Sequence, residues 1–160
     1  MKDIFFERKT IEQVEEGTEL APKFNSEGLI PAITTDYSSG EALMLGYMNQ
    51  EALEQTISTG EAHYYSRSRE QIWRKGATSG LIQKVKQLLV DDDQDSIWLR
   101  VEVLGNGASC HVGYRSCFYR SVPFGKEFKN KEDLKLEFTE TEKVFDPEVM
   151  YPGVANPTKL

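Results

Sequence analysis

Residues 88–101 read LLVDDDQDSIWLRV and place four aspartates within five positions of an otherwise apolar run. Acidic residues are poor strand formers, and carboxylates this close together repel one another. The run therefore predicts two strands joined through the aspartates. Spacing alone leaves two interpretations of that joint open, because it suits either an acidic turn or a cation site.

The order of the aspartates bears on the second interpretation. In an extended chain alternate side chains share a face, so Asp91, Asp93 and Asp95 would lie on one side while Asp92 points to the other. Three carboxylates on one side suit a hard divalent cation such as magnesium. Asp92 needs a separate explanation.

The chain as a whole has the composition of a globular domain. It has 160 residues, of which 39% are hydrophobic and 28% charged, and this length is sufficient for one domain with a real core. A net charge of −7 argues against nucleic acid or an anionic membrane as the main partner. Because no apolar stretch is long enough to span a bilayer and MKDIFFERKT has no apolar signal core, we expect a cytoplasmic protein.

The remaining pattern predicts an α+β protein of mostly antiparallel strands with few helices. GLIPAITTDYSSGEALMLGYM predicts a hairpin, and Asn49 and Gly60 would begin and end a helix. AHYYSRS alternates like a strand, and REQIWRKGATSG predicts a basic, polar loop. Residues 1–27 are polar and predict an arm with a short helix, while the proline-containing end of the chain predicts an irregular tail.

Cys110-His111, followed by Cys117, is the clearest chemical motif. Thiolates suit zinc, and the imidazole beside them can bind metal or move protons. With two cysteines in the chain the pair alone is a weak zinc signal, and two buried thiols beside a surface histidine is the plainer interpretation. Zinc needs at least one more protein ligand, which Asp92 can supply as a carboxylate.

SRSREQIWRKGATSG is a basic stretch inside an acidic protein. Arginine forks, hydroxyls and backbone N–H groups are donors for phosphate oxygens, although most charge runs are solvated surface. Tyr64 is interpreted as core, and Glu140 with Glu142 as a solvated face. The predicted phosphate-binding residues are Arg67, Arg69, Arg74, Lys75, Thr78, Ser79 and Arg115.

Several segments together resemble one enzyme family. GLIPAI, EALMLGYMNQEAL, TGEAHYYSRSREQIWRKGATSG, IQKV, DDDQD and ASCHVGYRSCFYR occur in an order and at spacings similar to those of phosphoribosyl-AMP cyclohydrolases, which act in histidine biosynthesis. The resemblance covers residues 28–121. It implies a cyclohydrolase domain there, an N-terminal arm at 1–27 and a C-terminal extension packed on the domain at 122–160.

The resemblance also implies an intertwined homodimer whose active sites are shared between chains. The family's flanking aspartates, matching Asp91, Asp93 and Asp95, hold magnesium. Two family cysteines, matching Cys110 and Cys117, bind zinc together with a third cysteine from the partner chain.

This chain departs from the family at that third cysteine, because Asp92 stands in its place. We expect Asp92 to replace the thiolate as an oxygen ligand, which would make the zinc more Lewis acidic. A zinc affinity unchanged by Asp92→Ala would contradict this expectation. Smaller departures are Leu81, where many members have histidine, and Ala77, where many have glutamate.

The reaction implied is hydrolytic opening of the N1–C6 bond of the purine ring of phosphoribosyl-AMP. Zinc would supply hydroxide near neutral pH, and His111 is the candidate general acid and base. Deamination of a related nucleotide is the alternative within the enzyme class. A nucleotide-binding or metal-binding module that has lost catalysis is the alternative outside that class.

Overall fold

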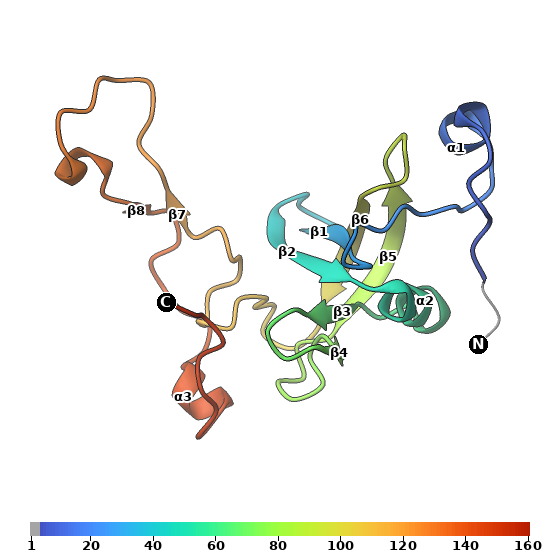
Figure 1. Cartoon of the computed structure of the whole chain (residues 1–160). Helices are drawn as coiled ribbons and strands as arrows, with labels where there is room; N and C mark the ends of the chain where they lie inside the picture. The colour runs from blue at the N-terminus through green and yellow to red at the C-terminus, as the bar shows by residue number, and fades with distance from the viewer. Residues whose placement is uncertain (1–3) are drawn as a thin grey trace.

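The computed structural model describes residues 4–160. Within these residues the chain forms a four-stranded sheet of order β2-β1-β6-β5, which is the centre of the molecule in Figure 1. The strands are β1 (Ile30–Asp36), β2 (Ala42–Met48), β5 (Gln83–Val90) and β6 (Ile97–Val103). Each outer strand pairs antiparallel with its sequence neighbour, and β1 and β6 pair in parallel at the centre. The prediction of an α+β fold with few helices and mostly antiparallel strands is confirmed.

Both predicted hairpins are present. The turn between β1 and β2 is closed by Asp36, whose Oδ2 accepts hydrogen bonds from the amides of Ser38 (3.1 Å) and Ser39 (2.8 Å). The predicted helix is α2 (Gln50–Thr59). It begins at Asn49, whose side chain accepts from the amide of Ala52, and ends at Gly60, which adopts a left-handed φ of 69°.

The helix α2 and a small two-stranded sheet cover one face of the main sheet. Strand β3 (His63–Ser66) pairs antiparallel with β4 (Gln71–Arg74). Leu53 of α2 and Tyr64 of β3 join Leu43, Leu99 and other sheet residues in a single buried cluster. The prediction that the whole stretch REQIWRKGATSG forms a loop was wrong at β4, because backbone pairing with β3 makes a strand of its polar residues.

The opposite face of the main sheet carries an apolar row. Leu45, Ile33, Trp98 and Leu89 are register partners across β2, β1, β6 and β5. Leu45, Ile33 and Trp98 are 49%, 45% and 42% exposed, although a sheet residue of this kind is usually covered. This face of the sheet therefore has no cover within residues 4–160.

The described part of the N-terminal arm and the C-terminal extension lie on opposite sides of the sheet (Figure 1). The arm contains the predicted short helix, α1 (Ile11–Glu16). After the cysteine-bearing loop come β7 (Arg120–Ser121), the 3-10 helix η1 (Lys131–Leu134), β8 (Glu137–Phe138) and α3 (Pro147–Met150). These short elements are joined by irregular segments that reach away from the sheet (Figure 1). The tripartite division of the chain stays a prediction.

Candidate active site

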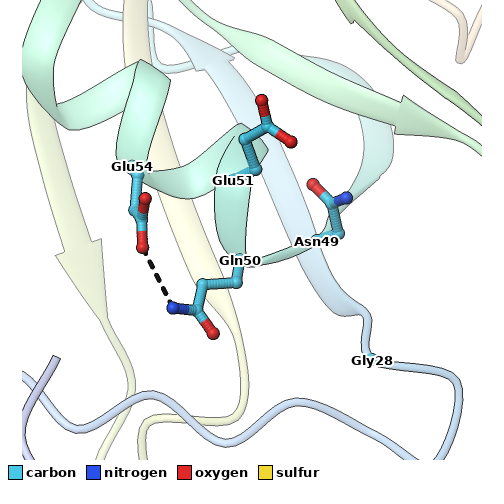
Figure 2. Close-up of a pocket in the computed structure, with 5 residues that line it drawn as sticks. All are labelled: Gly28, Asn49, Gln50, Glu51 and Glu54. Carbon is cyan, nitrogen blue, oxygen red and sulfur yellow. Dashed lines mark hydrogen bonds between the residues drawn. The ribbon is translucent and has the colours of Figure 1, made fainter. Parts of the chain in front are cut away.

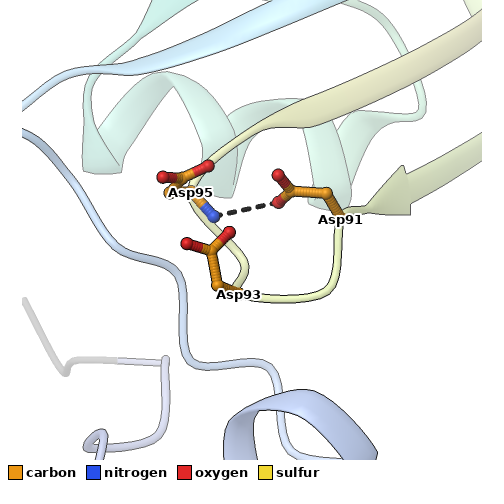
Figure 3. A group of neighbouring side chains, drawn as sticks. All are labelled: Asp91, Asp93 and Asp95. Atoms are coloured by element: carbon orange, nitrogen blue, oxygen red, sulfur yellow. Dashed lines mark hydrogen bonds between the residues drawn. The ribbon is translucent and has the colours of Figure 1, made fainter.

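The acidic motif forms the turn between β5 and β6. Ligand oxygens of Asp91, Asp93 and Asp95 all lie within 4.8 Å of one another, as Figure 3 shows. Asp91 Oδ1 accepts from the amides of Asp95 and Ser96, both at 3.0 Å. The three carboxylates are thus brought together by a turn and not by strand alternation, while Asp92 is exposed.

Close approach perturbs these carboxyls in opposite directions. Partial burial would raise the pKa of Asp91, but hydrogen bonds from Ser96 and Asp95 outweigh it and hold that pKa below its usual value. The pKa of Asp95 is raised by desolvation and by the negative charges of Asp93 and Asp91. A divalent cation would relieve this repulsion, because oxygen donors are its preferred ligands.

The loop that carries Cys110 and Cys117 is fixed by backbone hydrogen bonds. The amide of Cys110 donates to Tyr114 O (3.1 Å), and the amide of Cys117 donates to Leu43 O of β2 (2.7 Å). The two thiols lie close enough to perturb each other's pKa, so the structure brings both predicted sulfur ligands together. In the same loop, the ring nitrogen Nε2 of His111 is buried and has no hydrogen-bond partner within residues 4–160.

The pKa values of the two thiols are shifted in opposite directions. The neighbouring Cys117 thiol, the amide of Val112, and the charges of His111 and Lys75 lower the pKa of Cys110 to about 6. The Cys110 thiol and desolvation raise the pKa of Cys117, although part of that residue is exposed to solvent. Cys110 is therefore the more acidic thiol of the pair, and a thiolate is the form that binds a metal.

Lys75 connects the basic stretch to the cysteine loop. Its Nζ donates to Ser109 O at 2.6 Å, next to Cys110 in the chain. Burial lowers the pKa of Lys75, and the negative charges of Cys117 and Cys110 oppose that shift. The structure thus places this predicted phosphate ligand against the thiols.

Within a single chain, the other predicted phosphate ligands have separate contacts and do not form one cluster. Arg74 forms an ion pair with Glu61 at 3.2 Å, and Arg115 forms a bidentate ion pair with Glu41. The guanidinium of Arg67 lies 4.2 Å from the centre of the Tyr47 ring. Of the remaining three, Arg69 Nε donates to Ser66 Oγ, Ser79 Oγ accepts from the amide of Leu81, and Thr78 is exposed. Arg67 and Arg69 have no carboxylate partner within residues 4–160 and are the freest cations of the set.

A buried polar network supports the cysteine loop from the sheet, and sequence reasoning missed it. The Tyr64 hydroxyl lies 2.6 Å from Thr34 Oγ1 and donates to Gln83 Oε1 at 2.6 Å. Gln83 Nε2 in turn donates to Ser109 Oγ at 3.3 Å. The interpretation of Tyr64 as core is correct for its ring, but its hydroxyl also links β1 and β5 to the loop. The signal available in the sequence was the polar residue Gln83 inside the apolar run LIQKV.

Glu140 was also interpreted wrongly from the sequence. Its carboxylate accepts hydrogen bonds from the amides of Arg115 (2.6 Å) and Ser116 (3.3 Å), so it is not a solvated face. These two amides lie between His111 and Cys117. The C-terminal extension therefore holds the cysteine loop through Glu140.

A surface hollow at the start of α2 contains none of the predicted site residues. Figure 2 shows its lining by Gly28, Asn49, Gln50, Glu51 and Glu54, which together enclose about 320 Å³. The two glutamates make it acidic and unsuited to a phosphate.

In the part of the chain that the structure describes, no helix is long and apolar enough to cross a membrane.

Comparisons with known proteins agree with the resemblance found in the sequence. The family model described as Phosphoribosyl-AMP cyclohydrolase matches residues 44–119. Relatives of that name come from Bradyrhizobium diazoefficiens (47% identical, covering 87% of this chain and 94% of the relative) and Rhizobium etli (50%, covering 86% and 89%). A third, from Nitrobacter winogradskyi, is 44% identical over 147 residues, covering 92% of this chain and 97% of the relative.

These matches place the chain in the cyclohydrolase class, whose members open rings by adding water. The chain belongs to the phosphoribosyl-AMP cyclohydrolase family, which catalyses the ring-opening step of histidine biosynthesis. An alignment over 147 of 160 residues takes in parts of both the arm and the C-terminal extension, because each is longer than the 13 residues (160 − 147) left out. Parts of both end segments are therefore aligned with a relative of that name.

Proposed function

We propose that this protein hydrolyses the N1–C6 bond of phosphoribosyl-AMP and so opens the purine ring. The observation that carries the proposal is family membership over nearly the whole chain, together with a cysteine–histidine loop and a lysine beside it. A substituent on N1 leaves C6 electron-poor, so water can add there. Collapse of the adduct then breaks the N1–C6 bond.

Cys110, Cys117 and the partner chain's copy of Asp92 would hold zinc. The donor set fits, because thiolates are zinc ligands, the pKa of Cys110 is lowered and the Cys117 thiol lies beside it. When bound there, zinc supplies the Lewis acidity that lowers the pKa of water toward neutral. The Asp91, Asp93 and Asp95 carboxylates would hold magnesium, which neutralises phosphate charge when bound.

The chain's own residues supply proton transfer and charge. His111 is the candidate general acid and base, because its Nε2 is left without a partner within residues 4–160. Lys75 places a cation beside the thiols, where it would stabilise the negative charge that develops on the ring adduct. Arg67 and Arg69 are the first candidates for phosphate contacts, since no carboxylate competes for them in the described chain.

We also propose that the protein is a homodimer with shared active sites. Asp92 lies in the β5–β6 turn and the cysteines lie in the loop after β6, and zinc needs a ligand beyond the two sulfurs. The exposed side chains of Leu45, Ile33 and Trp98, with the partly exposed Leu89, offer an apolar surface that a second copy would cover. Replacing Ile33 with glutamate should produce monomers in sedimentation and lower activity together.

The test is ring opening of phosphoribosyl-AMP by metal-stripped protein titrated with zinc in the presence of magnesium. Restoration of activity without release of ammonia supports the proposal, since ring opening retains the amino group. Ammonia release would identify a deaminase. Absence of reaction with any metal, from a folded dimer, would identify a binding module.

A further inference from the structure

One side chain fastens the N-terminal arm to the acidic turn. Gln94 lies between Asp93 and Asp95 and is only 4% exposed. Its Oε1 accepts from the amide of Ala21 at 2.8 Å. Its Nε2 donates to Val14 O at 3.0 Å and to Glu19 O at 3.2 Å. Three positions of the arm are thus held by a single residue of the turn.

The backbone of Gln94 makes the turn that gathers the carboxylates. Its φ is +56°, a left-handed conformation that costs a residue other than glycine about 1 kcal/mol. Its amide donates to Asp91 O at 3.2 Å, and its carbonyl accepts from the amide of Lys23 at 2.7 Å. The arm therefore stabilises the strained residue on which the approach of Asp93 and Asp95 to Asp91 depends.

Arg8 forms a second link between the arm and the turn. Its guanidinium donates to Ala21 O at 2.6 Å and to Asp93 O at 2.8 Å. The second bond joins the arm directly to the backbone of one of the three aspartates. In Figure 3 the arm runs past the turn on the side of Asp93 and Asp95.

We propose that Gln94 and Arg8 are positioning residues for the magnesium-binding carboxylates, so that Mg²⁺ affinity depends on attachment of the arm. The inference rests on the magnesium role proposed above for Asp91, Asp93 and Asp95. Groups that orient metal ligands from behind contribute strongly to metal affinity. Because linkage is reciprocal, bound Mg²⁺ also holds the arm more firmly against the turn.

Titration calorimetry with Mg²⁺ on the full-length protein tests this dependence. Gln94→Gly removes the side chain while still permitting the left-handed φ, and it should weaken Mg²⁺ binding about tenfold. Arg8→Gln should weaken it several-fold. Lys9→Gln is the matched control, because Lys9 is the exposed neighbour of Arg8 and carries the same charge.

The Lys9→Gln control also shows how the loss of one positive charge by itself changes Mg²⁺ affinity. Removing a positive charge from the arm would by itself raise the affinity for a cation. A weaker affinity in Arg8→Gln, with an unchanged or tighter one in Lys9→Gln, can therefore come only from lost positioning. Equal affinities in the two variants, or a Gln94→Gly protein that binds Mg²⁺ within about twofold of the unchanged chain, would overturn the proposal.

Hydrogen exchange gives a readout that is independent of affinity. Saturation with Mg²⁺ should slow exchange of the Ala21 and Lys23 amides in the unchanged protein and leave it unaffected in Asp93→Asn. Exchange at both amides that does not respond to Mg²⁺ also overturns the proposal. If the unchanged chain shows no Mg²⁺ binding that Asp93→Asn removes, the magnesium role itself fails. Mg²⁺ binding that Asp93→Asn removes but that keeps its full affinity in the Gln94 and Arg8 variants refutes the positioning role alone.

Discussion

Replacing Tyr64 with phenylalanine tests whether the buried polar network stabilises the fold. The substitution keeps the ring, which packs in the core, and removes the hydroxyl that joins Thr34 to Gln83. Burial raises the pKa of Tyr64, so the hydroxyl stays protonated and available for donation across the pH range of any ordinary assay.

The magnitude follows from what the substitution leaves behind. Gln83 is 0% exposed, and its Oε1 has no second partner within residues 4–160. A buried acceptor that loses its partner costs about 1–3 kcal/mol. The lost hydrogen bond between the Thr34 and Tyr64 hydroxyls costs about 1 kcal/mol more. We therefore expect Tyr64→Phe to lower the free energy of unfolding by about 3 kcal/mol. For a chain of this length that is about 9 °C in Tm.

Urea unfolding followed by circular dichroism measures the change directly. Tyr65→Phe is the matched control, because Tyr65 is the neighbouring tyrosine and makes no hydrogen bond among residues 4–160 through its hydroxyl. It should change stability by less than about 0.5 kcal/mol. A Tyr64→Phe protein as stable as the Tyr65→Phe protein would refute the assignment of a structural role to the network.

Three further changes test the loop, a turn and a helix end. Glu140→Ala should weaken zinc binding in a chelator competition, because the amides of Arg115 and Ser116 lose their acceptor, while the exposed Glu142→Ala should not. Equal zinc affinities would contradict that role. Hydrogen bonds from Ser38 and Ser39 hold the pKa of Asp36 below its ordinary value, so its ionised form stabilises the fold. Urea unfolding of Asp36→Ala should show a deficit that is full above about pH 4 and shrinks as pH falls through the folded pKa. A deficit equal at pH 7 and pH 2.5 would rule this out. Asn49→Ala should cost about 1 kcal/mol and Asn49→Ser almost nothing, because serine also caps helices. Equal losses in thermal unfolding would show that the cap is not the cause.

The parts of the fold that the sequence predicts are those that depend on interactions between residues close together in the chain. Asn49 and Gly60 bound α2 because a side-chain acceptor and a left-handed φ are needed at those two ends. The hairpin turns were found through their aspartates for the same reason. Strand β4 was missed because Gln71–Arg74 is half polar, and only pairing with β3 makes it a strand.

The candidate site was predictable in its residue types and less so in its contacts. The gathering of Asp91, Asp93 and Asp95 was expected from strand alternation, whereas a left-handed Gln94 produces it. The contact of Glu140 with the cysteine loop joins positions 25 and 24 residues apart, and no local pattern encodes it. Long-range hydrogen bonds of this kind depend on where tertiary packing places a loop.

The parallel pairing of β1 with β6 has a consequence for how the chain folds. Each of these strands belongs to a local hairpin, but the seam between them joins Ala32 to Ile97, 65 positions apart (97 − 32). Closing so large a loop loses much chain entropy before any contact at the seam compensates for it. We therefore expect the two hairpins to form early and their docking along this seam to limit the folding rate. Substitutions of buried seam residues such as Ile97 or Leu99 should then slow folding, whereas changes in the hairpin turns should mainly alter the rates at which each hairpin opens and closes.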